Sequence, residues 1–174
     1  GAQLEGFDTM VKLTKEAPII ILEGDEYLSS PIDKRPKFHW YKPHIAVLSG
    51  IAWDHINVFP TFENYVEQFR IFKEDVKEVL IYCETDEVLS KLANEKSKCR
   101  LKAYATPSHE IENGVSYLVD DNERIPLMVF GEHNLQNMNA ARLVCQEVGV
   151  NEEQFYEAIQ SFKGASKRLE LVRK

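Results

Sequence analysis

Three short, continuous apolar runs, each followed by polar residues, constrain the fold of this chain most strongly. They cover residues 18–22, 45–48 and 79–82. A strand buried on both faces needs apolar side chains at every position, so such runs are typical of parallel strands covered by helices. Between and after them, apolar residues recur every three or four positions in 62–72 and 88–93, which is the spacing of amphipathic helices. The alternation predicts an α/β fold with a mostly parallel sheet.

The second half of the chain begins with a segment, 115–130, that predicts a β-hairpin. Two apolar stretches there flank the polar residues 120–123, the pattern of two strands joined by a turn. We therefore expect a mixed sheet. Two helices are predicted next, one from Gly131 and Asn134 to about Gly149, and one from Asn151 to about Phe162. Asn151 suits the N-cap of the second helix.

Size and composition exclude several classes of protein. The chain has 174 residues and a formal net charge of −7, so it suits one domain, and general binding to nucleic acid is unfavoured. Its three cysteines, Cys83, Cys99 and Cys145, form no CxxC pair, which favours a reducing cytoplasm over a disulfide framework. No apolar run approaches the length of a membrane span. The first residue is Gly1, not methionine, so we expect the chain to begin inside a longer protein or after a processed tag.

Two polar clusters follow predicted strands, where open parallel sheets place their ligands. The first is Glu23-Gly24-Asp25-Glu26-Tyr27, whose carboxylates can hold a hard cation such as magnesium. A merely solvated acidic loop is the alternative. The second is Trp53-Asp54-His55, in which the imidazole can serve as a metal ligand or a phosphate partner. The alternative for His55 is helix capping or packing beside Trp53.

Two further clusters lie near the end of the chain. Asn134 and Asn137 are three residues apart at a helix start, so they share a face, and each carboxamide offers the donor and acceptor that an adenine edge requires. Ordinary capping by Asn134 is the alternative. The last cluster is a glycine turn at Gly164 followed by Lys167 and Arg168. Arg168 can grip a phosphate with two hydrogen bonds, or it can belong to a solvated basic end.

Together and in this order, these clusters resemble the central domain of the Mur ligases. The most specific part is Gly131-x-His133-Asn134-x-x-Asn137-x-x-Ala140-Ala141. The resemblance implies a three-layer domain over residues 1–167, truncated before Gly1, with residues 168–174 starting a linker. It also implies N- and C-terminal domains of the same parent chain as partners.

The resemblance further implies an ATP-dependent reaction with Mg²⁺ as cofactor. Glu23 and His55 match the family's metal-binding positions, and Asn134, Asn137 and His133 match positions near the nucleotide. Arg168 matches the arginine that contacts the terminal phosphate. In this family a substrate carboxylate attacks the γ-phosphate, and an amine then displaces phosphate from the acyl phosphate. Glu23, His55 and Arg168 are thus the expected catalytic residues.

The acidic loop and the later Asp33-Lys34-Arg35-Pro36-Lys37-Phe38 stretch look most like the recycling branch of the family. Members of that branch join UDP-N-acetylmuramate to the tripeptide L-alanyl-γ-D-glutamyl-meso-diaminopimelate. The branch that adds L-alanine to UDP-N-acetylmuramate is the second expectation. We expect these small-molecule substrates, and neither nucleic acid nor membrane, as further partners.

Departures from the family pattern leave other possibilities open. The phosphate loop, Gly-x-x-Gly-Lys-Thr/Ser, is absent from the chain, so we expect this piece alone not to turn over ATP. Gly50 and Ala52 stand where relatives commonly have asparagine and glutamate. A nucleotide-binding module without catalysis is therefore an alternative. A hydrolase using a metal held by Glu23, Asp25, Asp54 and His55 is another.

Overall fold

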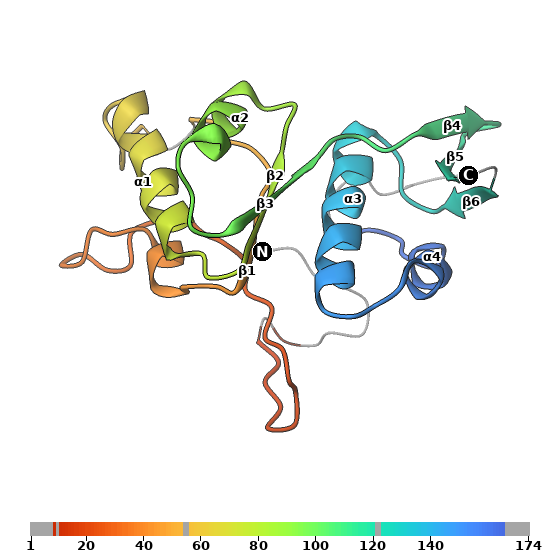
Figure 1. Cartoon of the computed structure of the whole chain (residues 1–174), viewed down its shortest axis with the longest axis horizontal. Helices are drawn as coiled ribbons and strands as arrows, with labels where there is room; N and C mark the ends of the chain where they lie inside the picture. Colours follow the sequence, from red (N-terminus) through yellow and green to blue (C-terminus); the bar gives the residue numbers. More distant parts are fainter. Residues whose placement is uncertain (1–8, 10, 54–55, 121–122, 166–174) are drawn as a thin grey trace.

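The protein is an α/β domain built around two separate three-stranded sheets (Figure 1). The computed structural model describes residue 9 and residues 11–53, 56–120 and 123–165. The first sheet is parallel, in the order β1 (Ile45–Leu48), β2 (Val79–Cys83) and β3 (Arg100–Tyr104). The second is antiparallel, in the order β4 (His109–Glu112), β5 (Val115–Asp120) and β6 (Glu123–Leu127). The predicted α/β fold and hairpin are confirmed, but the hairpin does not join the parallel sheet.

The central strand β2 is apolar at successive positions because both of its faces are buried. Val79, Leu80 and Ile81 are fully buried because helices cover both faces of the sheet. Helices α1 (Phe62–Asp75) and α2 (Glu87–Asn94) lie on one side, and α3 (Glu132–Glu147) lies on the other (Figure 1). These three layers enclose the larger core.

Helices α1, α2 and α4 each begin at a capping side chain. The Thr61 hydroxyl accepts a hydrogen bond from Asn64 N at 3.1 Å at the start of α1, and Asp86 caps α2. Helix α4 (Glu152–Ile159) begins with the predicted Asn151 cap, which forms a capping box with Gln154. Such side chains satisfy backbone N–H groups that have no partner within the helix.

One predicted strand is wrong. Residues 18–22 form no strand and are exposed, Ile21 by 89%. They belong to a long excursion, drawn in red, that projects away from the body of the molecule (Figure 1). An apolar run becomes a buried strand only where other elements cover it. In the part of the chain that the structure describes, nothing does.

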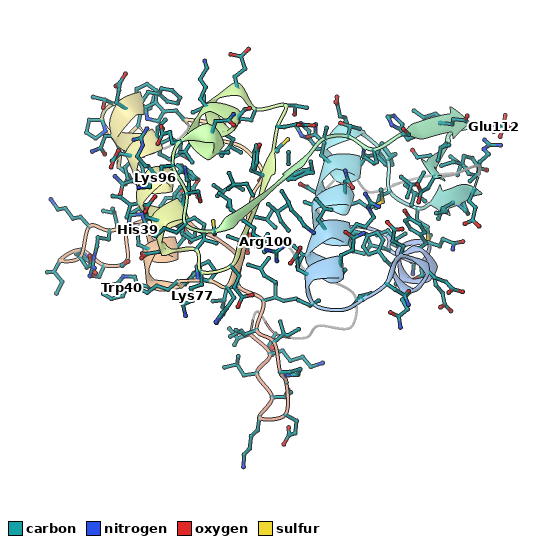
Figure 2. The ribbon with its side chains drawn as sticks, viewed as in Figure 1. His39, Trp40, Lys77, Lys96, Arg100 and Glu112 are labelled. Atoms are coloured by element: carbon teal, nitrogen blue, oxygen red, sulfur yellow. The ribbon has the colours of Figure 1, made fainter. Side chains whose placement is uncertain are left out.

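Two strands were not predicted. Strand β3 has charged side chains at Arg100 and Lys102, so it lacks a continuous apolar run; both pair with Glu147 of α3. Figure 2 shows Arg100 between β3 and α3. Strand β4 pairs with β5 through the turn Asn113–Gly114. Both turn residues have positive φ, 51° and 80°, which is the backbone of a tight hairpin turn that Asn-Gly favours.

Lys73 is the one lysine of the described residues that is almost fully buried, at 2% exposure. Its Nζ donates to Leu92 O at 2.7 Å and to Glu95 O at 3.0 Å, so it satisfies the carboxyl end of α2. We expect Lys73→Met to lower the free energy of unfolding by about 1–3 kcal/mol, because the carbonyls of Leu92 and Glu95 each lose a hydrogen bond from the buried ammonium group. Denaturant unfolding measures the change. The control Lys91→Met, on α2 and with a side chain that is 80% exposed, should change stability little, and equal effects of the two would contradict this role.

Glu147 joins α3 to β3 through Arg100 and Lys102, and hydrogen bonds from these two cations lower its pKa. A lowered folded-state pKa contributes stability above the unfolded value, about 4.3 for glutamate, and that stability is lost as pH falls through the folded value. Glu147→Gln should therefore cost about 1 kcal/mol at pH 7 and progressively less below about pH 4. Unfolding of both proteins across pH tests this. Glu74→Gln, at an exposed pair with Lys98, should show no such trend.

Candidate functional site

The carboxyl edge of the parallel sheet is formed by three loops, which follow β1, β2 and β3. Ligands of open α/β sheets bind at this edge. The loop after β1 leads through Gly50 and Ile51 to the predicted Asp54-His55 pair. Asp54 and His55 themselves lie outside the described residues, as does Arg168.

Asp86 connects two of these loops. Its Oδ1 accepts hydrogen bonds from Val88 N and Leu89 N, both at 2.9 Å, and its Oδ2 accepts one from Ile51 N at 2.9 Å. The carboxylate thus caps α2 and holds the loop after β1. A Cβ on Gly50 would lie 3.4 Å from Asp86 Oδ2, so this loop runs close to the cap. The sequence pattern of an aspartate before a helix could have shown the cap but not its second partner.

The acidic loop, residues 23–27, holds three carboxylates with different surroundings. Asp25 accepts from Lys37 Nζ at 2.8 Å and from Tyr27 N at 2.7 Å. Glu26 accepts from the Tyr65 hydroxyl at 3.4 Å. Glu23 is exposed, and no described residue forms a hydrogen bond or ion pair with its carboxylate. Of the three, Glu23 is therefore the carboxylate whose oxygens are open to an external ligand.

The first two predicted clusters both approach the first turns of α1. Glu26 reaches Tyr65, while the ring of Trp53 lies 6.1 Å from that of Phe62. The Trp53 indole also donates to Phe59 O at 3.0 Å. Trp53 is therefore a packing residue beside α1. The acidic loop and the loop after β1 both contact this helix.

The start of α3 presents the predicted carboxamides. Gly131 has φ 86° and is the N-cap, with no side-chain cap bond. Asn134 is not that cap: its Nδ2 donates to Phe130 O at 2.8 Å. His133 and Asn137 are exposed, and no described residue forms a hydrogen bond with either side chain. Asn137 thus keeps both its donor and its acceptor available.

Side chains on another part of α3 attach it to the loop after β3. Thr106 Oγ1 donates to Glu132 and accepts from Gln136 Nε2, both at 3.1 Å. Asn139 Nδ2 donates to Ala105 O at 2.8 Å. These bonds bring the start of α3 to the same carboxyl edge as the loops after β1 and β2. The sequence did not indicate these three positioning side chains.

The residues present fit a Mg²⁺ site only in part. Among the described residues, no group of three or more His, Cys, Asp or Glu side chains could enclose a metal ion. Magnesium bound with a nucleotide needs less, because it retains several waters and takes one or two carboxylates together with phosphate oxygens. The exposed Glu23 suits that mode of binding.

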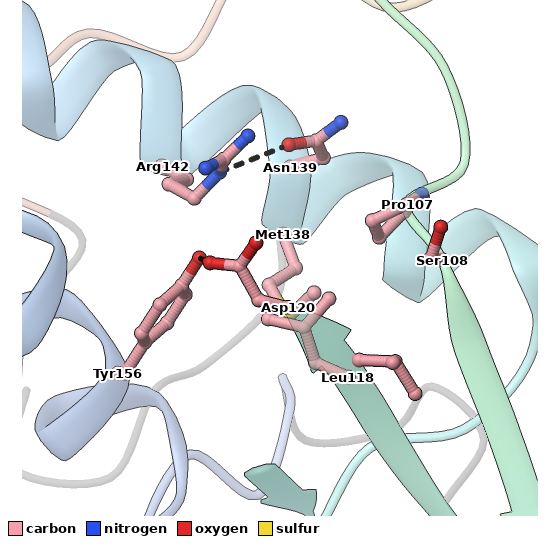
Figure 3. Close-up of a pocket in the computed structure, with 9 residues that line it drawn as sticks. Pro107, Ser108, Leu118, Asp120, Met138, Asn139, Arg142 and Tyr156 are labelled. Carbon is pink, nitrogen blue, oxygen red and sulfur yellow. Dashed lines mark hydrogen bonds between the residues drawn. The ribbon is translucent and has the colours of Figure 1, made fainter. Parts of the chain in front are cut away.

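A cavity of about 210 Å³ lies away from the predicted residues, between α3, α4 and the antiparallel sheet (Figure 3). Its charged and polar groups already contact one another. The Tyr156 hydroxyl donates to Asp120 Oδ2 at 2.5 Å, and Arg142 Nε donates to Asn139 Oδ1 at 3.2 Å. Burial and Asp120 together raise the pKa of Tyr156 to about 12. This cavity offers a ligand few open polar groups.

None of the helices in the described ranges is long and apolar enough to cross a bilayer.

Comparison with known proteins agrees with the fold. UDP-N-acetylmuramoylalanine–D-glutamate ligase from Thermoanaerobacter sp. (strain X514) is 34% identical over an alignment 149 positions long, which covers 76% of this chain and 32% of that protein. The enzyme of the same name from Citrifermentans bemidjiense is 27% identical over an alignment 185 positions long, which covers 96% of this chain and 41% of that protein. The chain therefore spans less than half the length of these relatives.

Solved structures share the fold. UDP-N-acetylmuramate:L-alanyl-γ-D-glutamyl-meso-diaminopimelate ligase from Neisseria meningitides superimposes with a TM-score of 0.70 at 24% identity, over 82% of this chain and 47% of that one. MurF from Acinetobacter baumannii does so with 0.65 at 18% identity, over 79% and 33%. The profile of the Mur ligase middle domain matches residues 5–145. This chain belongs to the Mur ligase family, whose members are ATP-dependent ligases, and carries the middle domain of that family.

Proposed function

We propose that this chain is the central ATP-binding domain of a ligase that joins UDP-N-acetylmuramate to L-alanyl-γ-D-glutamyl-meso-diaminopimelate. Residues 1–167 form the domain in this proposal, and residues 168–174 begin the linker to a C-terminal domain. The carrying observation is the exposed Glu23 carboxylate in a loop that is otherwise held by protein partners. The loop sequence is the one that resembles the recycling branch, and two solved ligases of that name share the fold.

The chemistry assigns a task to each side chain. The carboxylate of UDP-N-acetylmuramate attacks the γ-phosphorus of ATP, the bond to the ADP oxygen breaks, and an acyl phosphate forms. The peptide amine then attacks the acyl carbon, phosphate leaves, and the amine loses a proton. Mg²⁺ supplies neutralisation of the phosphate charge when it is bound. Glu23 and His55 would hold it, and Arg168 would contact the terminal phosphate.

Asn137 and Asn134 have different tasks in this proposal. Asn137 presents an unused donor and acceptor to the adenine edge. Asn134 bonds to Phe130 O, so it shapes the turn that precedes α3 and reads the nucleotide with its remaining groups. His133, exposed beside them, completes the nucleotide face.

A second candidate is addition of D-glutamate, because the curated relatives that are 27–34% identical carry that name. Addition of L-alanine is the third. All three share the acyl-phosphate route and differ in the amine, and addition of D-glutamate also uses a UDP-sugar that already carries L-alanine. The middle domain is therefore compatible with each.

Phosphate release by the full-length protein distinguishes these functions. ATP and Mg²⁺ are supplied with UDP-N-acetylmuramate plus tripeptide, with UDP-N-acetylmuramate plus L-alanine, or with UDP-N-acetylmuramoyl-L-alanine plus D-glutamate. We expect release only with the tripeptide. Release of phosphate only with L-alanine or only with D-glutamate would show that this amine, and not the tripeptide, is the substrate. Release with none of the three mixtures would indicate a binding module without catalysis. This chain alone, which lacks the phosphate loop, is the control and should release none.

The adenine assignment predicts a selective effect of Asn137→Ala. The KM for ATP should rise about tenfold, as for loss of one bidentate base contact, while the KM for the UDP-sugar stays unchanged. Because Asn137 is exposed and unbonded within the described chain, the melting temperature should also stay unchanged. Asn139→Ala, which loses the bond to Ala105 O, should instead lower the melting temperature. An equal rise of both KM values for Asn137→Ala would contradict the assignment.

A further inference from the structure

We infer that Thr106 is a positioning residue that sets the base selectivity of the proposed nucleotide site by holding the first two turns of α3 in one orientation. The inference rests on the proposed function, because it takes Asn137 as the side chain that reads adenine. It goes beyond that proposal by naming a residue on the loop after β3 that acts on the base through α3 and not by contact.

The Thr106 hydroxyl bonds to both of these turns at once. Its Oγ1 donates to Glu132 Oε1 and accepts from Gln136 Nε2, both at 3.1 Å. Glu132 and Gln136 are four residues apart on the helix, so they lie one above the other on the same face. The single hydroxyl thus uses its donor and one acceptor lone pair on successive turns of α3.

The segment that carries this hydroxyl is itself fixed. Thr106 lies in the connection 105–108 between the two sheets, which runs past the start of α3 (Figure 1). On one side of it, Tyr104 at the end of β3 is buried, at 3% exposure. On the other side, Ser108 O accepts a hydrogen bond from Val119 N of β5 at 2.9 Å. Thr106 therefore offers α3 an anchor that is attached to both sheets.

The start of α3 lacks the side-chain cap that begins α1, α2 and α4. Its N-cap is Gly131, which has no side chain to accept from the backbone of the first turn. The orientation of that turn then depends on contacts with other elements. Leu135 and Met138 hold the helix from one side by burial in the core of the antiparallel sheet, and Thr106 holds it from a second side by hydrogen bonds.

These contacts determine where the open carboxamide of α3 points. His133 and Asn137 each directly follow one of the two residues that Thr106 holds, and both are exposed. Because an α-helix has about 3.6 residues per turn, a rotation of its first two turns about the axis moves His133 and Asn137 together. A bidentate contact to a base edge needs two hydrogen bonds to align at once. Loss of the Thr106 bonds should therefore weaken selection of the base.

The test compares binding of ADP with binding of inosine diphosphate, whose base has a carbonyl oxygen in place of the adenine amine. Isothermal titration calorimetry on the full-length protein gives both dissociation constants for the wild type, Thr106→Val and Thr106→Ser. Valine has the shape of threonine without the hydroxyl, whereas serine retains the hydroxyl. Thr106→Val should lower the preference for ADP about fivefold, the size of one net hydrogen bond, and Thr106→Ser should stay within twofold of the wild type.

Thr85→Val is the matched control. Thr85 also follows a strand at the carboxyl edge of the parallel sheet, but in the described part of the chain its hydroxyl bonds to Cys83, at 3.1 Å, and not to α3. The preference of Thr85→Val for ADP should stay within twofold of the wild type. An unchanged preference in Thr106→Val, or an equal fall in Thr85→Val, would overturn the inference.

Gln136→Met tests the same contact from the helix, because it keeps the length of the side chain and removes its donor. The double variant Thr106→Val/Gln136→Met should lower the preference no further than Thr106→Val does, since both changes remove the same bond. An additive fall would show that the two side chains act separately and would contradict the inference. If Thr106→Val does not fold, Gln136→Met takes its place and should lower the preference about threefold.

Asn137→Ala separates the inference from the proposed function. If Asn137→Ala lowers the preference for ADP but Thr106→Val and Gln136→Met do not, the adenine assignment stands and the positioning role is wrong. If the wild type binds both nucleotides equally, or if Asn137→Ala keeps the wild-type preference, the adenine assignment itself fails, and the role of Thr106 fails with it.

Discussion

Helix α3 is packed on two sides, and the arrangement of the whole domain depends on that double burial. Ala140 belongs to the core of the parallel sheet, with Leu143 and Val144 beside it, while Leu135 and Met138 belong to the core of the antiparallel sheet. The helix therefore joins two sheets that share no strand pairing. Its first turn also carries the proposed nucleotide-binding residues, so the packing that holds the sheets together places those residues as well.

Single carboxylates perform a similar joining role for two of the loops. Asp86 holds the loop after β1 while capping α2, and Asp25 holds the acidic loop through Lys37. Each uses both of its oxygens on protein donors. Loops cannot be fixed by a regular backbone ladder, so their geometry depends on such side-chain acceptors. Glu23 differs from its neighbours Asp25 and Glu26 because no described residue donates a hydrogen bond to its carboxylate.

A helix or strand could be predicted from the sequence where its buried residues follow a regular pattern. The run at β2 and the spacing of Tyr65, Phe69 and Phe72 in α1 each reflect the faces that are buried, and both predictions are confirmed. Strand β3 could not be found in this way, because an edge strand can carry Arg100 and Lys102 when α3 supplies Glu147. The Asn113–Gly114 turn was a readable signal for β4 that the hairpin prediction did not use.

The candidate site likewise has features that the sequence determines and features that only the tertiary structure determines. Residue types and spacing determined by themselves that the chain carries carboxylates in residues 23–27, carboxamides at a helix start and a cation near its end, because those chemistries are local properties of the chain. They also determined an α/β fold, since apolar periodicity records which faces an element buries. Only the tertiary structure decided that residues 18–22 stay exposed, that Asn134 bonds to Phe130 and leaves the cap to Gly131, and that Glu23, not Asp25 or Glu26, is open to a ligand. Each of those outcomes depends on which other residues lie close in space. The strength of a contact depends on the distance between its atoms, and spacing along the chain does not specify that distance.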